Sequence, residues 1–482
     1  MKINYKFRYQ LLQVLVILLC LPFFVQSQVI TFQKVYPSSK DKAAMDVIPT
    51  SDGGYIMTGM TNNSNVNDMD AYILKTNNLG DTMWTRSYGG PKPDQGNRIM
   101  PTADGNYFII GCSQSYGGGD YDIYLLKINP TGGMIWYKTY GGSGNDNGNE
   151  IIATTDGNYM ITGTTYTTSS NSDAFLMKID PAGNVLWEKY YGGPADDQGN
   201  SLKQSPDGGY VMAGLTFSYG QGGDAYLVKT NAIGDTTWTK NYGGPLNDEA
   251  KYVLANSDGS ITFCVRDSST GAGDIDIQVI KVNSVGAPLW NKVYGGTKKD
   301  TPKMIQPTSD GGYIVCGHSR SFGWITPQMW LIRLNSIGDS TWTRHYGGSA
   351  HQHCYAARQT ADGGYIAAGF TRSYSPIQEI MFLKLDPTGA VGIEEIAMDN
   401  NIAFNIYPNP TDGLLKIDIV GSESYFTFKI NNTLGQEVYT GTINFSGHNV
   451  SQTINLENFE SGAYFLNIQS EKSFITKKIM LR

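Results

Sequence analysis

Short apolar runs separated by glycine-rich turns recur along residues 32–390. In one typical unit these runs cover residues 199–204, 210–214, 224–229 and 237–242. The third run is almost wholly apolar, whereas the fourth alternates apolar and polar residues at a period of two, as strands with one solvent-facing side do. The pattern therefore predicts four β-strands in each unit.

The unit repeats along the chain at intervals of 51 or 52 residues. Its most regular feature is an Asp-Gly-Gly turn or a close variant, which begins at Asp52, Asp104, Asp156, Asp207, Asp258, Asp310 and Asp362. A second feature is a Trp followed four residues later by Tyr-Gly-Gly, with the Trp at positions Trp84, Trp136, Trp187, Trp238, Trp290 and Trp342. A constant period of this length is typical of solenoids and propellers.

The two ends of the repeat region complement each other. Residues 32–36 match the strand that carries the Trp, yet no such strand follows the last unit. A first strand that completes the last unit closes a ring and removes an exposed sheet edge. We therefore expect an all-β fold in which residues 28–390 form a seven-bladed β-propeller, closed by the N-terminal strand, with residues 32–36 pairing onto the strand around residues 381–385.

Composition narrows the class of protein. The chain has 482 residues with 57 Gly and 12% aromatic residues, which suits many short strands, and the 16% of charged residues is too low for a disordered or coiled-coil chain. Its formal net charge is −7 and no basic stripe is present, so we expect no nucleic-acid partner.

Residues 1–27 have the features of a secretory signal peptide. Lys2, Lys6 and Arg8 precede an almost continuous apolar run, and Ser27 is a small residue suited to cleavage. The apolar run is too short for a membrane span, and we expect no transmembrane segment after cleavage. Lipidation at Cys20 is an alternative, but Leu19 stands where a small residue is required.

The repeat stops near residue 390. Residues 391–402 are predicted to be a linker, and residues 403–482 a separate small domain. Within that domain, residues 415–419, 426–430 and 464–468 alternate apolar and polar positions. This pattern predicts a small antiparallel β-sandwich.

Several short motifs of the second domain follow one another in order along its whole length. Their principal residues are Tyr407, Pro408, Asn409, Pro410, Gly413, Gly435, Gly462, Tyr464, Lys477 and Lys478. In this arrangement the domain resembles the type A C-terminal sorting domain of the type IX secretion system. The resemblance implies a Sec-exported precursor that the type IX translocon and sorting machinery recognise, and a product that is attached to the outer-membrane surface or released into the extracellular space.

Loops that follow the second strand of several units carry candidate ligand-binding residues. An aromatic residue recurs there in four units, and three further Arg or Trp residues accompany them: Tyr116, Tyr219, Arg320, Phe322, Trp324, Arg372 and Tyr374. Rigid aromatic and Arg side chains are enriched at recognition surfaces. An alternative stays open, because a residue that recurs from unit to unit can also pack locally.

Two patterns raise the alternative of metal binding. His351 and His353 lie on one side of an extended segment, a spacing that suits zinc or copper, but no further ligand is fixed by the sequence. Aspartates recur in the loops at Asp94, Asp146, Asp197, Asp248 and Asp300, and again at Asp70, Asp122, Asp173, Asp224 and Asp276. Such carboxylates can bind calcium, but their recurrence favours capping of backbone amides in each turn. We therefore predict no metal and no cofactor.

No catalytic motif is present in the sequence. We predict a secreted or cell-surface, non-enzymatic binding or adhesion protein whose glycan or protein ligand is unknown. The alternative is a surface glycan-active enzyme, a glycosidase or a lyase, because a propeller scaffold excludes no activity. Its catalytic residues would then be ones that break the repeat, such as His351, His353 or Arg372.

Overall fold

A computed structural model describes most of the chain. The described residues are 30–62, 69–166, 171–323, 325–391, 403–409, 411–420, 425–432, 436–444, 449–469 and 474–482. Within them all regular structure is β-strand, and no helix is present that is long and apolar enough to cross a membrane. The predicted signal peptide and nearly all of the predicted linker lie outside the described residues.

Seven four-stranded sheets account for the repeats in the described part of the chain. Sheet 1 contains β2 (Lys42–Pro49), β3 (Tyr55–Asn62), β4 (Met69–Thr76) and β5 (Thr82–Tyr88); sheet 2 contains β6 (Asp94–Pro101), β7 (Tyr107–Ser113), β8 (Asp122–Ile128) and β9 (Met134–Tyr140). Sheet 3 contains β10 (Asn147–Ala153), β11 (Tyr159–Thr165), β12 (Asp173–Ile179) and β13 (Val185–Tyr191); sheet 4 contains β14 (Asp197–Gln204), β15 (Tyr210–Thr216), β16 (Asp224–Thr230) and β17 (Thr236–Tyr242); sheet 5 contains β18 (Glu249–Ala255), β19 (Ile261–Asp267), β20 (Asp276–Val282) and β21 (Pro288–Tyr294). Sheet 6 contains β22 (Asp300–Pro307), β23 (Tyr313–Ser319), β24 (Gln328–Leu334) and β25 (Ser340–Tyr346); sheet 7 contains β26 (Gln352–Gln359), β27 (Tyr365–Thr371), β28 (Glu379–Leu385) and, from the start of the chain, β1 (Phe32–Tyr36).

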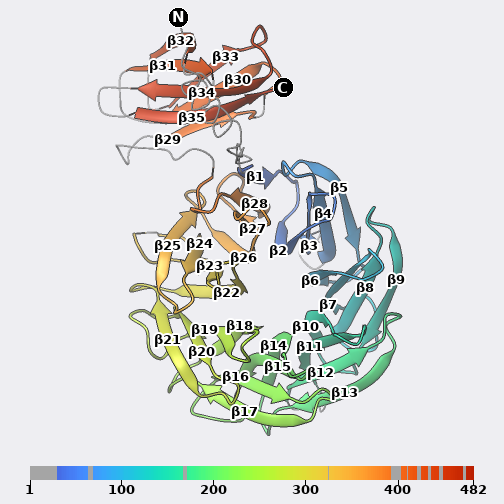
Figure 1. Ribbon diagram of the computed structural model, residues 1–482. Coiled ribbons are helices and arrows are strands. Elements are labelled where there is room, and N and C mark those ends of the chain that lie inside the picture. Colours follow the sequence, from blue (N-terminus) through green and yellow to red (C-terminus); the bar gives the residue numbers. More distant parts are fainter. Residues whose placement is uncertain are drawn as a thin grey trace, which may run out of the picture.

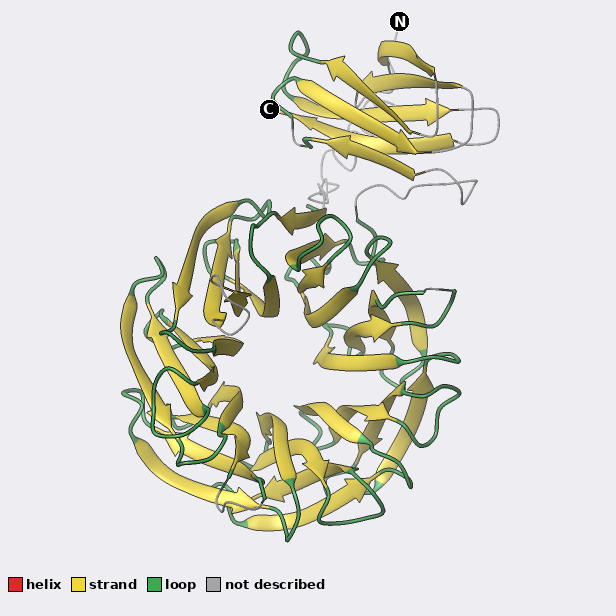
Figure 2. Ribbon diagram, turned by 180° about the vertical axis from the view of Figure 1, so that it is seen from behind, coloured by secondary structure: helices red, strands yellow, loops and turns green. Residues whose placement is uncertain are grey.

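The sheets follow one another in sequence order around a common axis, in propeller-like repeats (Figures 1 and 2). The first strand of each sheet as given above lies nearest the axis, and the outermost strand is the one that carries the Trp, or β1 in sheet 7 (Figure 1). The second and third strands are almost fully buried, whereas the outermost strands alternate between exposed and partly buried residues. The sequence predicted this difference, because strands covered on both faces are continuously apolar.

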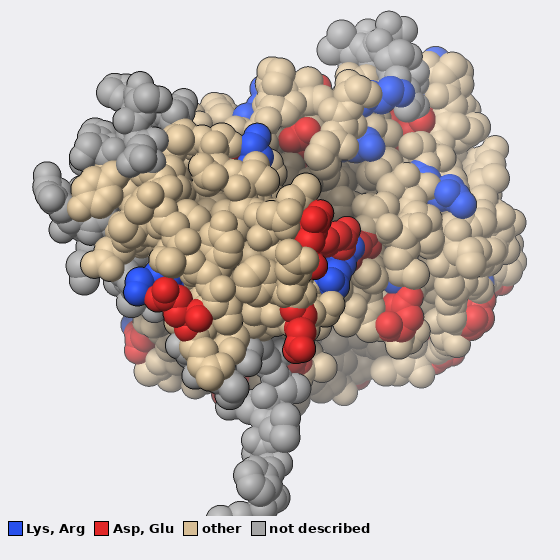
Figure 3. Space-filling model, turned by 90° about the horizontal axis from the view of Figure 1, so that it is seen from above, with Lys and Arg blue, Asp and Glu red and all other residues tan. Residues whose placement is uncertain are grey.

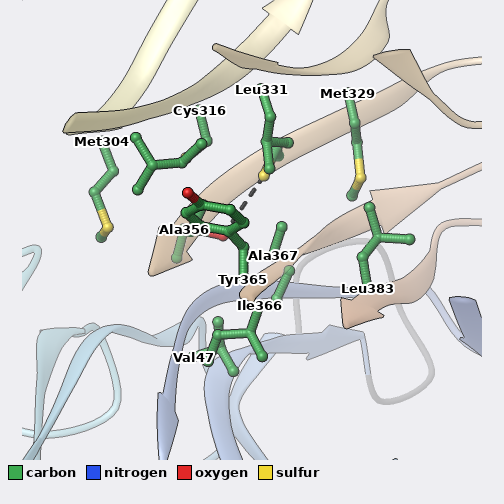
Figure 4. Packing of buried hydrophobic residues seen from close by; sticks show 14 of the residues in the cluster. Val47, Met304, Cys316, Met329, Leu331, Ala356, Tyr365, Ile366, Ala367 and Leu383 are labelled. Carbon is green, nitrogen blue, oxygen red and sulfur yellow. Dashed lines mark hydrogen bonds between the residues drawn. The ribbon is translucent and has the colours of Figure 1, made fainter. Parts of the chain in front are cut away.

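The first strand of the chain belongs to the last sheet. β1 pairs with β28 in antiparallel register, from Phe32 opposite Lys384 to Tyr36 opposite Ile380. This is the pairing that we expected from the sequence. One apolar cluster runs from sheet 5 through sheets 6 and 7 into sheet 1, and Figure 4 shows Val47 of β2 beside Ile366 of β27 within it.

Each sheet contacts the next one through the same pair of groups. The Tyr of the Tyr-Gly-Gly motif donates a hydrogen bond to the carbonyl oxygen of the hairpin Gly in the following sheet. The donor and acceptor pairs are Tyr36 and Gly80, Tyr88 and Gly132, Tyr140 and Gly183, Tyr191 and Gly234, Tyr242 and Gly286, Tyr294 and Gly338, and Tyr346 and Gly389. The Tyr36 bond, 2.7 Å long, joins sheet 7 to sheet 1.

These hairpin positions require glycine for two reasons. Their φ angles lie between +75° and +85°, where a residue with a Cβ is strained. A Cβ on Gly132 would also lie 2.9 Å from the Trp84 ring, and a Cβ on Gly80 would lie 2.7 Å from the Phe32 ring. Phe32 of β1 therefore takes the place that a Trp takes in the other sheets.

In each sheet a buried or partly buried cation pairs with the Asp of the repeated Asp-Gly-Gly turn. The pairs are Asp52 with Lys75, Asp104 with Lys127, Asp156 with Lys178, Asp207 with Lys229, Asp258 with Lys281, Asp310 with Arg333, and Asp362 with Lys384. The cation comes from the third strand of the same sheet. Six pairs are 2.5–2.8 Å long, but Lys281 lies 3.8 Å from Asp258.

Four cysteines lie in the repeats, at Cys112, Cys264, Cys316 and Cys354, and all four are buried and free. At these four positions cysteine acts as a small hydrophobic residue, as free Cys commonly does in protein interiors.

The strands after residue 402 form two further antiparallel sheets. One contains β29 (Ala403–Tyr407), β30 (Leu414–Val420) and β33 (Asn449–Asn455), and the other contains β32 (Glu437–Asn444), β31 (Tyr425–Asn432), β34 (Gly462–Gln469) and β35 (Phe474–Leu481). Alternate residues such as Leu415 and Ile417 of β30 and Phe426 and Ile430 of β31 share one buried core. The alternation seen in the sequence therefore marked the inner faces of both sheets.

The contribution of β1 can be measured by deletion. We expect removal of residues 28–37 to lower the melting temperature by more than about 5 °C, because it exposes the edge of β28 and removes the Phe32 and Tyr36 contacts with sheet 1. Removal of residues 28–31, which leaves β1 intact, is the control and should change little. Equal melting temperatures for the two deletions in differential scanning calorimetry would contradict a structural role for β1.

The ion pairs can be tested with two matched substitutions. Lys127 and Asp104 lie 2.6 Å apart, with side chains 10% and 50% exposed, and the hydrogen bond from Lys127 holds the pKa of Asp104 below its ordinary value. Asp104→Asn should therefore lower the free energy of unfolding by about 1–2 kcal/mol, between the values for exposed and buried pairs. Asp258→Asn should lower the free energy of unfolding by less than Asp104→Asn does, because the pKa of Asp258 is lowered chiefly by Ser260 rather than by Lys281.

The sign of the pH dependence follows from the lowered pKa of Asp104. The stabilisation is present above the unfolded-state pKa of about 4 and is lost as the pH falls through the lower folded-state value. Urea unfolding of wild type and Asp104→Asn should therefore give curves that approach each other below about pH 4. A difference in stability that stays constant down to pH 2 would show that the charge of Asp104 is not its cause.

Candidate functional site

The loops that carry the predicted binding residues are tied to the connections between sheets. In sheet 2, the Asp94 carboxylate accepts hydrogen bonds from the Gly90 amide at 2.7 Å and from the Ser115 hydroxyl at 2.7 Å. The Gly amide bond recurs at 2.7–2.8 Å in Asp146, Asp197, Asp248 and Asp300. These aspartates therefore cap backbone amides, as the recurrence suggested. In the described part of the chain, no group of three or more His, Cys, Asp and Glu is arranged to hold a metal ion.

Two of the recurring aromatic residues have a packing role. The hydroxyl groups of Tyr116 and Tyr219 donate hydrogen bonds to the carbonyl oxygens of Gly89 and Gly192, at 2.7 and 2.8 Å. Tyr116 also packs against Tyr137, with ring centroids 4.7 Å apart. The local-packing alternative therefore holds for these two side chains, although Tyr219 stays 43% exposed.

The other predicted residues project from the loops of sheets 6 and 7. Arg320 and Phe322 lie between β23 and β24, and Arg372 and Tyr374 lie between β27 and β28; all four are exposed. Phe322 contacts Trp330 and His345 at centroid distances of 5.5 and 5.4 Å. Tyr374 accepts a hydrogen bond from Gln33 at 3.0 Å. Trp324 lies outside the described residues.

The two histidines that the sequence raised as an alternative metal site have different surroundings. His353 stacks on His318 of the neighbouring sheet, with centroids 3.9 Å apart, whereas His351 is exposed. Burial lowers the pKa of His353 to about 4, and burial lowers the pKa of His318 still further. Both stacked rings are therefore neutral near pH 7.

A cavity that the sequence interpretation missed lies on the axis of the sheets. Its volume is about 230 Å³, and one residue from each of the seven innermost strands lines it, together with Arg98: Met45, Asn97, Asn149, Asn200, Lys251, Lys303 and Tyr355. Each of these seven residues occupies the point where the register of the innermost strand shifts by one residue. A bulge aims its extra residue away from the ladder, and here it aims that residue at the axis.

Three of the bulge residues have a structural role that explains their identity. The side-chain amide groups of Asn97, Asn149 and Asn200 each donate a hydrogen bond of 2.8–3.0 Å to a carbonyl oxygen on the next innermost strand. Lys251, Lys303, Tyr355 and Met45 break this series. The signal was present in the sequence as one repeat position that reads Met, Asn, Asn, Asn, Lys, Lys, Tyr.

The walls beneath the cavity are held by buried ion pairs. Arg358 donates to Asp46 at 2.6 Å, and Lys203 donates to Glu150 at 2.5 Å. Glu150 also accepts hydrogen bonds from the Tyr252 hydroxyl at 2.9 Å and from the Ser201 hydroxyl at 2.6 Å. These bonds satisfy the carboxylates within the wall, as buried charges require.

The motif residues of the two C-terminal sheets hold those sheets together. Asn409 donates to the Lys478 carbonyl oxygen at 2.7 Å and accepts from the Met480 amide at 2.8 Å, so it is bound to β35 on both sides. Tyr464 donates to the Glu460 carbonyl oxygen, and Tyr407 donates to Asp418.

Other motif residues have their place in the same two sheets. The Gly413 carbonyl oxygen accepts from the Leu456 amide at 2.6 Å. Pro408 follows Tyr407 directly after β29, Gly462 begins β34, and Lys477 and Lys478 lie on β35, where burial lowers the pKa of both amines. Pro410 and Gly435 lie outside the described residues.

On the face of the molecule drawn in Figure 3, basic and acidic side chains do not form separate patches. Basic and acidic groups are intermixed there on a largely uncharged surface.

Comparisons with known proteins fall into two groups. Short similarities to the repeats include the regulatory protein FlaEY of Caulobacter vibrioides, which is 24% identical over 165 residues; the match covers 29% of this chain and 17% of FlaEY. Similar solved structures include the phage phi92 endosialidase (9% identity, 87% of this chain and 75% of that chain, TM-score 0.42) and Sqt1 from Chaetomium thermophilum (9% identity, 72% and 97%, TM-score 0.42). These similarities are too remote to bear on activity.

The comparison with protein families gives a firm result for the C-terminal part. Residues 405–482 match the family described as the secretion system C-terminal sorting domain. The match agrees with the motif residues and with the two-sheet structure that they stabilise. The protein therefore carries a type IX sorting tail and is exported to the cell surface or the extracellular space.

Proposed function

We propose that this chain is a secreted or surface-attached, non-enzymatic binding protein built on a closed seven-bladed β-propeller. Residues 1–27 are its signal peptide, residues 28–390 the propeller, residues 391–402 a linker, and residues 403–482 the sorting domain. The type IX secretion translocon and sorting machinery are its partners during export, and the sorting family match supports this part of the proposal.

One pairing within sheet 7 and two contacts between sheets 7 and 1 support ring closure. β1 completes sheet 7 by pairing with β28. Tyr36 then makes the same bond to sheet 1 that the equivalent Tyr residues make between the other sheets. The Lys42 amide also donates to the Gln378 carbonyl oxygen at 2.9 Å. The Tyr36 bond repeats a contact made between the other sheets, and this likeness supports the proposal of a closed ring.

The conformation of Phe322 carries the proposal of a binding surface on the loops of sheets 6 and 7. Phe322 has a φ of +60°, the sole positive value at a non-glycine among the described residues, and its ring is 59% exposed. Trp330 and His345 cover one side of this side chain and leave most of it in solvent. Strained backbone conformations of this kind cluster at functional sites. Its equivalents in sheets 2 and 4, Tyr116 and Tyr219, bond to the neighbouring connection instead.

Further exposed side chains extend the same surface. Ile325 is 85% exposed and Tyr374 is 53% exposed, and Arg320 and Arg372 contribute positive charge. Aromatic, apolar and Arg side chains grouped on neighbouring loops suit recognition of a glycan or a protein. The alternative of a glycan-active enzyme stays a prediction that only an activity measurement tests.

The sorting role leads to an export experiment. We expect a chain that ends at residue 402 to keep the seven sheets folded but to accumulate in the periplasm, because the machinery recognises the missing tail. Cell fractionation and surface proteolysis measure its location, and a full-length chain expressed at the same level is the control. Normal surface exposure of the shortened chain would overturn the sorting role.

The binding role leads to an array experiment with the full chain. On a glycan and protein array, Phe322→Ala and Arg372→Ala should each weaken binding by ~1–2 kcal/mol, as contact residues do. Tyr116→Phe is the matched control, because it removes a hydrogen bond from an equivalent loop whose ring is packed. Its binding should match wild type.

Two outcomes would contradict this proposal. Turnover of any glycan in a hydrolysis screen run beside the array would favour the enzyme alternative. Unchanged binding in both loop variants would place the ligand elsewhere on the protein.

A further inference from the structure

The axial cavity differs from the rest of the protein in its charge. The chain is acidic overall, with a formal net charge of −7, yet three cations and no carboxylate line the cavity. The cations are Arg98, Lys251 and Lys303, which come from sheets 2, 5 and 6. These three cations differ in whether a group of opposite charge lies against them.

Three carboxylates lie near the cavity, and each of them is already paired with a cation. Asp46 binds Arg358, and Glu150 binds Lys203 in the wall. Glu249 binds Lys251 and also accepts a hydrogen bond from Asn200 at 2.9 Å. Of the cavity cations, only Lys251 therefore has its charge balanced by a direct ion pair with a described residue.

Arg98 and Lys303 have no such partner among the described residues. Arg98 donates from Nη1 to the carbonyl oxygens of Met45 and Asn97 at 3.3 and 3.4 Å, and its Nε is buried without a hydrogen-bond partner. Lys303 makes neither a hydrogen bond nor an ion pair in the described structure. Its ammonium group lies 5.3 Å from the centre of the Tyr355 ring.

The protein environment disfavours the charge on Lys303. Burial, with the nearby charges of Lys251 and Arg98, lowers the pKa of Lys303 to about 8. A partly buried cation without a partner is costly, and proteins retain such groups where a ligand supplies the opposite charge. The Asn residues at the same repeat position show that the fold itself has no need of a Lys there.

We propose that the axial cavity is a binding site for a small organic anion that carries one carboxylate, sulfate or phosphate group. The anionic group lies between Arg98 and Lys303, and Lys251 adds to the positive potential. Arg98 offers a guanidinium group, which suits the flat geometry of two acceptor oxygens, whereas Lys303 acts as a point charge. The site is separate from the loop surface proposed above and does not depend on it.

The size and lining of the cavity set limits on the rest of the ligand. A volume of about 230 Å³ is below that of most drug-sized ligand sites, so it admits a single small molecule or the end of a chain. The side chains of Tyr355 and Met45 offer apolar surface to the uncharged part of the ligand. A charged monosaccharide, either free or at the end of a glycan, fits a cavity of this size and lining.

Calorimetric titration of the full chain tests this inference with defined probes. The probes are glucuronate, glucose 6-sulfate and glucose 6-phosphate, with glucose as the neutral control and inorganic sulfate as the bare anion. We expect at least one charged probe to bind and glucose not to bind. Affinity should fall as the salt concentration rises, because the attraction is electrostatic.

Matched substitutions locate the site. Lys303→Met should weaken binding of the charged probe by about tenfold or more, the effect of losing one charged contact. Lys298→Met removes an equal charge from an exposed position in the same part of the chain and should change affinity less than about twofold. Without ligand, Lys303→Met should melt at the same temperature as wild type or higher, since it removes an unbalanced charge.

Each result decides for or against the site. Binding of inorganic sulfate as tight as that of the sugars would support a site for the anionic group alone, and tighter binding of a sugar would support recognition of the whole molecule. Failure of every charged probe to bind, or equal binding by Lys303→Met and wild type, would overturn the inference. Phe322→Ala should leave anion binding unchanged, so a failure of this inference is distinguishable from a failure of the proposed loop surface.

Discussion

The contact between one sheet and the next is the constraint on which the repeat region depends. A Tyr hydroxyl group binds the carbonyl oxygen of a hairpin Gly, and a Trp or Phe ring covers the same glycine. That residue must have a positive φ and must also lack a Cβ, so no other amino acid fits. Because the glycine and its partner lie in successive sheets, the near-constant spacing of the motifs follows from the geometry of this contact.

Much of the fold could be predicted because the same pattern of strands and turns recurs seven times in the sequence. The alternation of apolar and polar residues marked the outer strands, and the missing strand after residue 390 identified β1 as the partner of β28. In the C-terminal part, residues such as Asn409 and Tyr464 were recognised from their order along the chain. Their hydrogen bonds to β35 and to the Glu460 carbonyl oxygen give that order a physical reason.

The candidate sites were harder to predict, because they depend on residues that the chain brings together over long distances. The bulge residues lie 51 or 52 positions apart and meet only where seven innermost strands face one axis. His318 could not be paired with His353 from the sequence, since their stacking depends on how two sheets pack. The buried lysines were missed for another reason: Lys127 or Lys229 in an apolar strand looks like an exposed residue until its pairing with the turn Asp is known.

The position of β1 also determines when sheet 7 can form during synthesis and folding of the chain. Gln33 and Tyr374 contact each other although they lie 341 positions apart in the sequence. The first strand to be synthesised, β1, therefore cannot pair until the last strand of the repeats, β28, has been made. Contacts with such long sequence separation carry a large entropic cost and form slowly. The sorting tail comes later in the chain than β28. A polypeptide that has acquired the tail has therefore already received every strand of sheet 7, and a chain interrupted before β28 lacks both the partner of β1 and the segment that directs export.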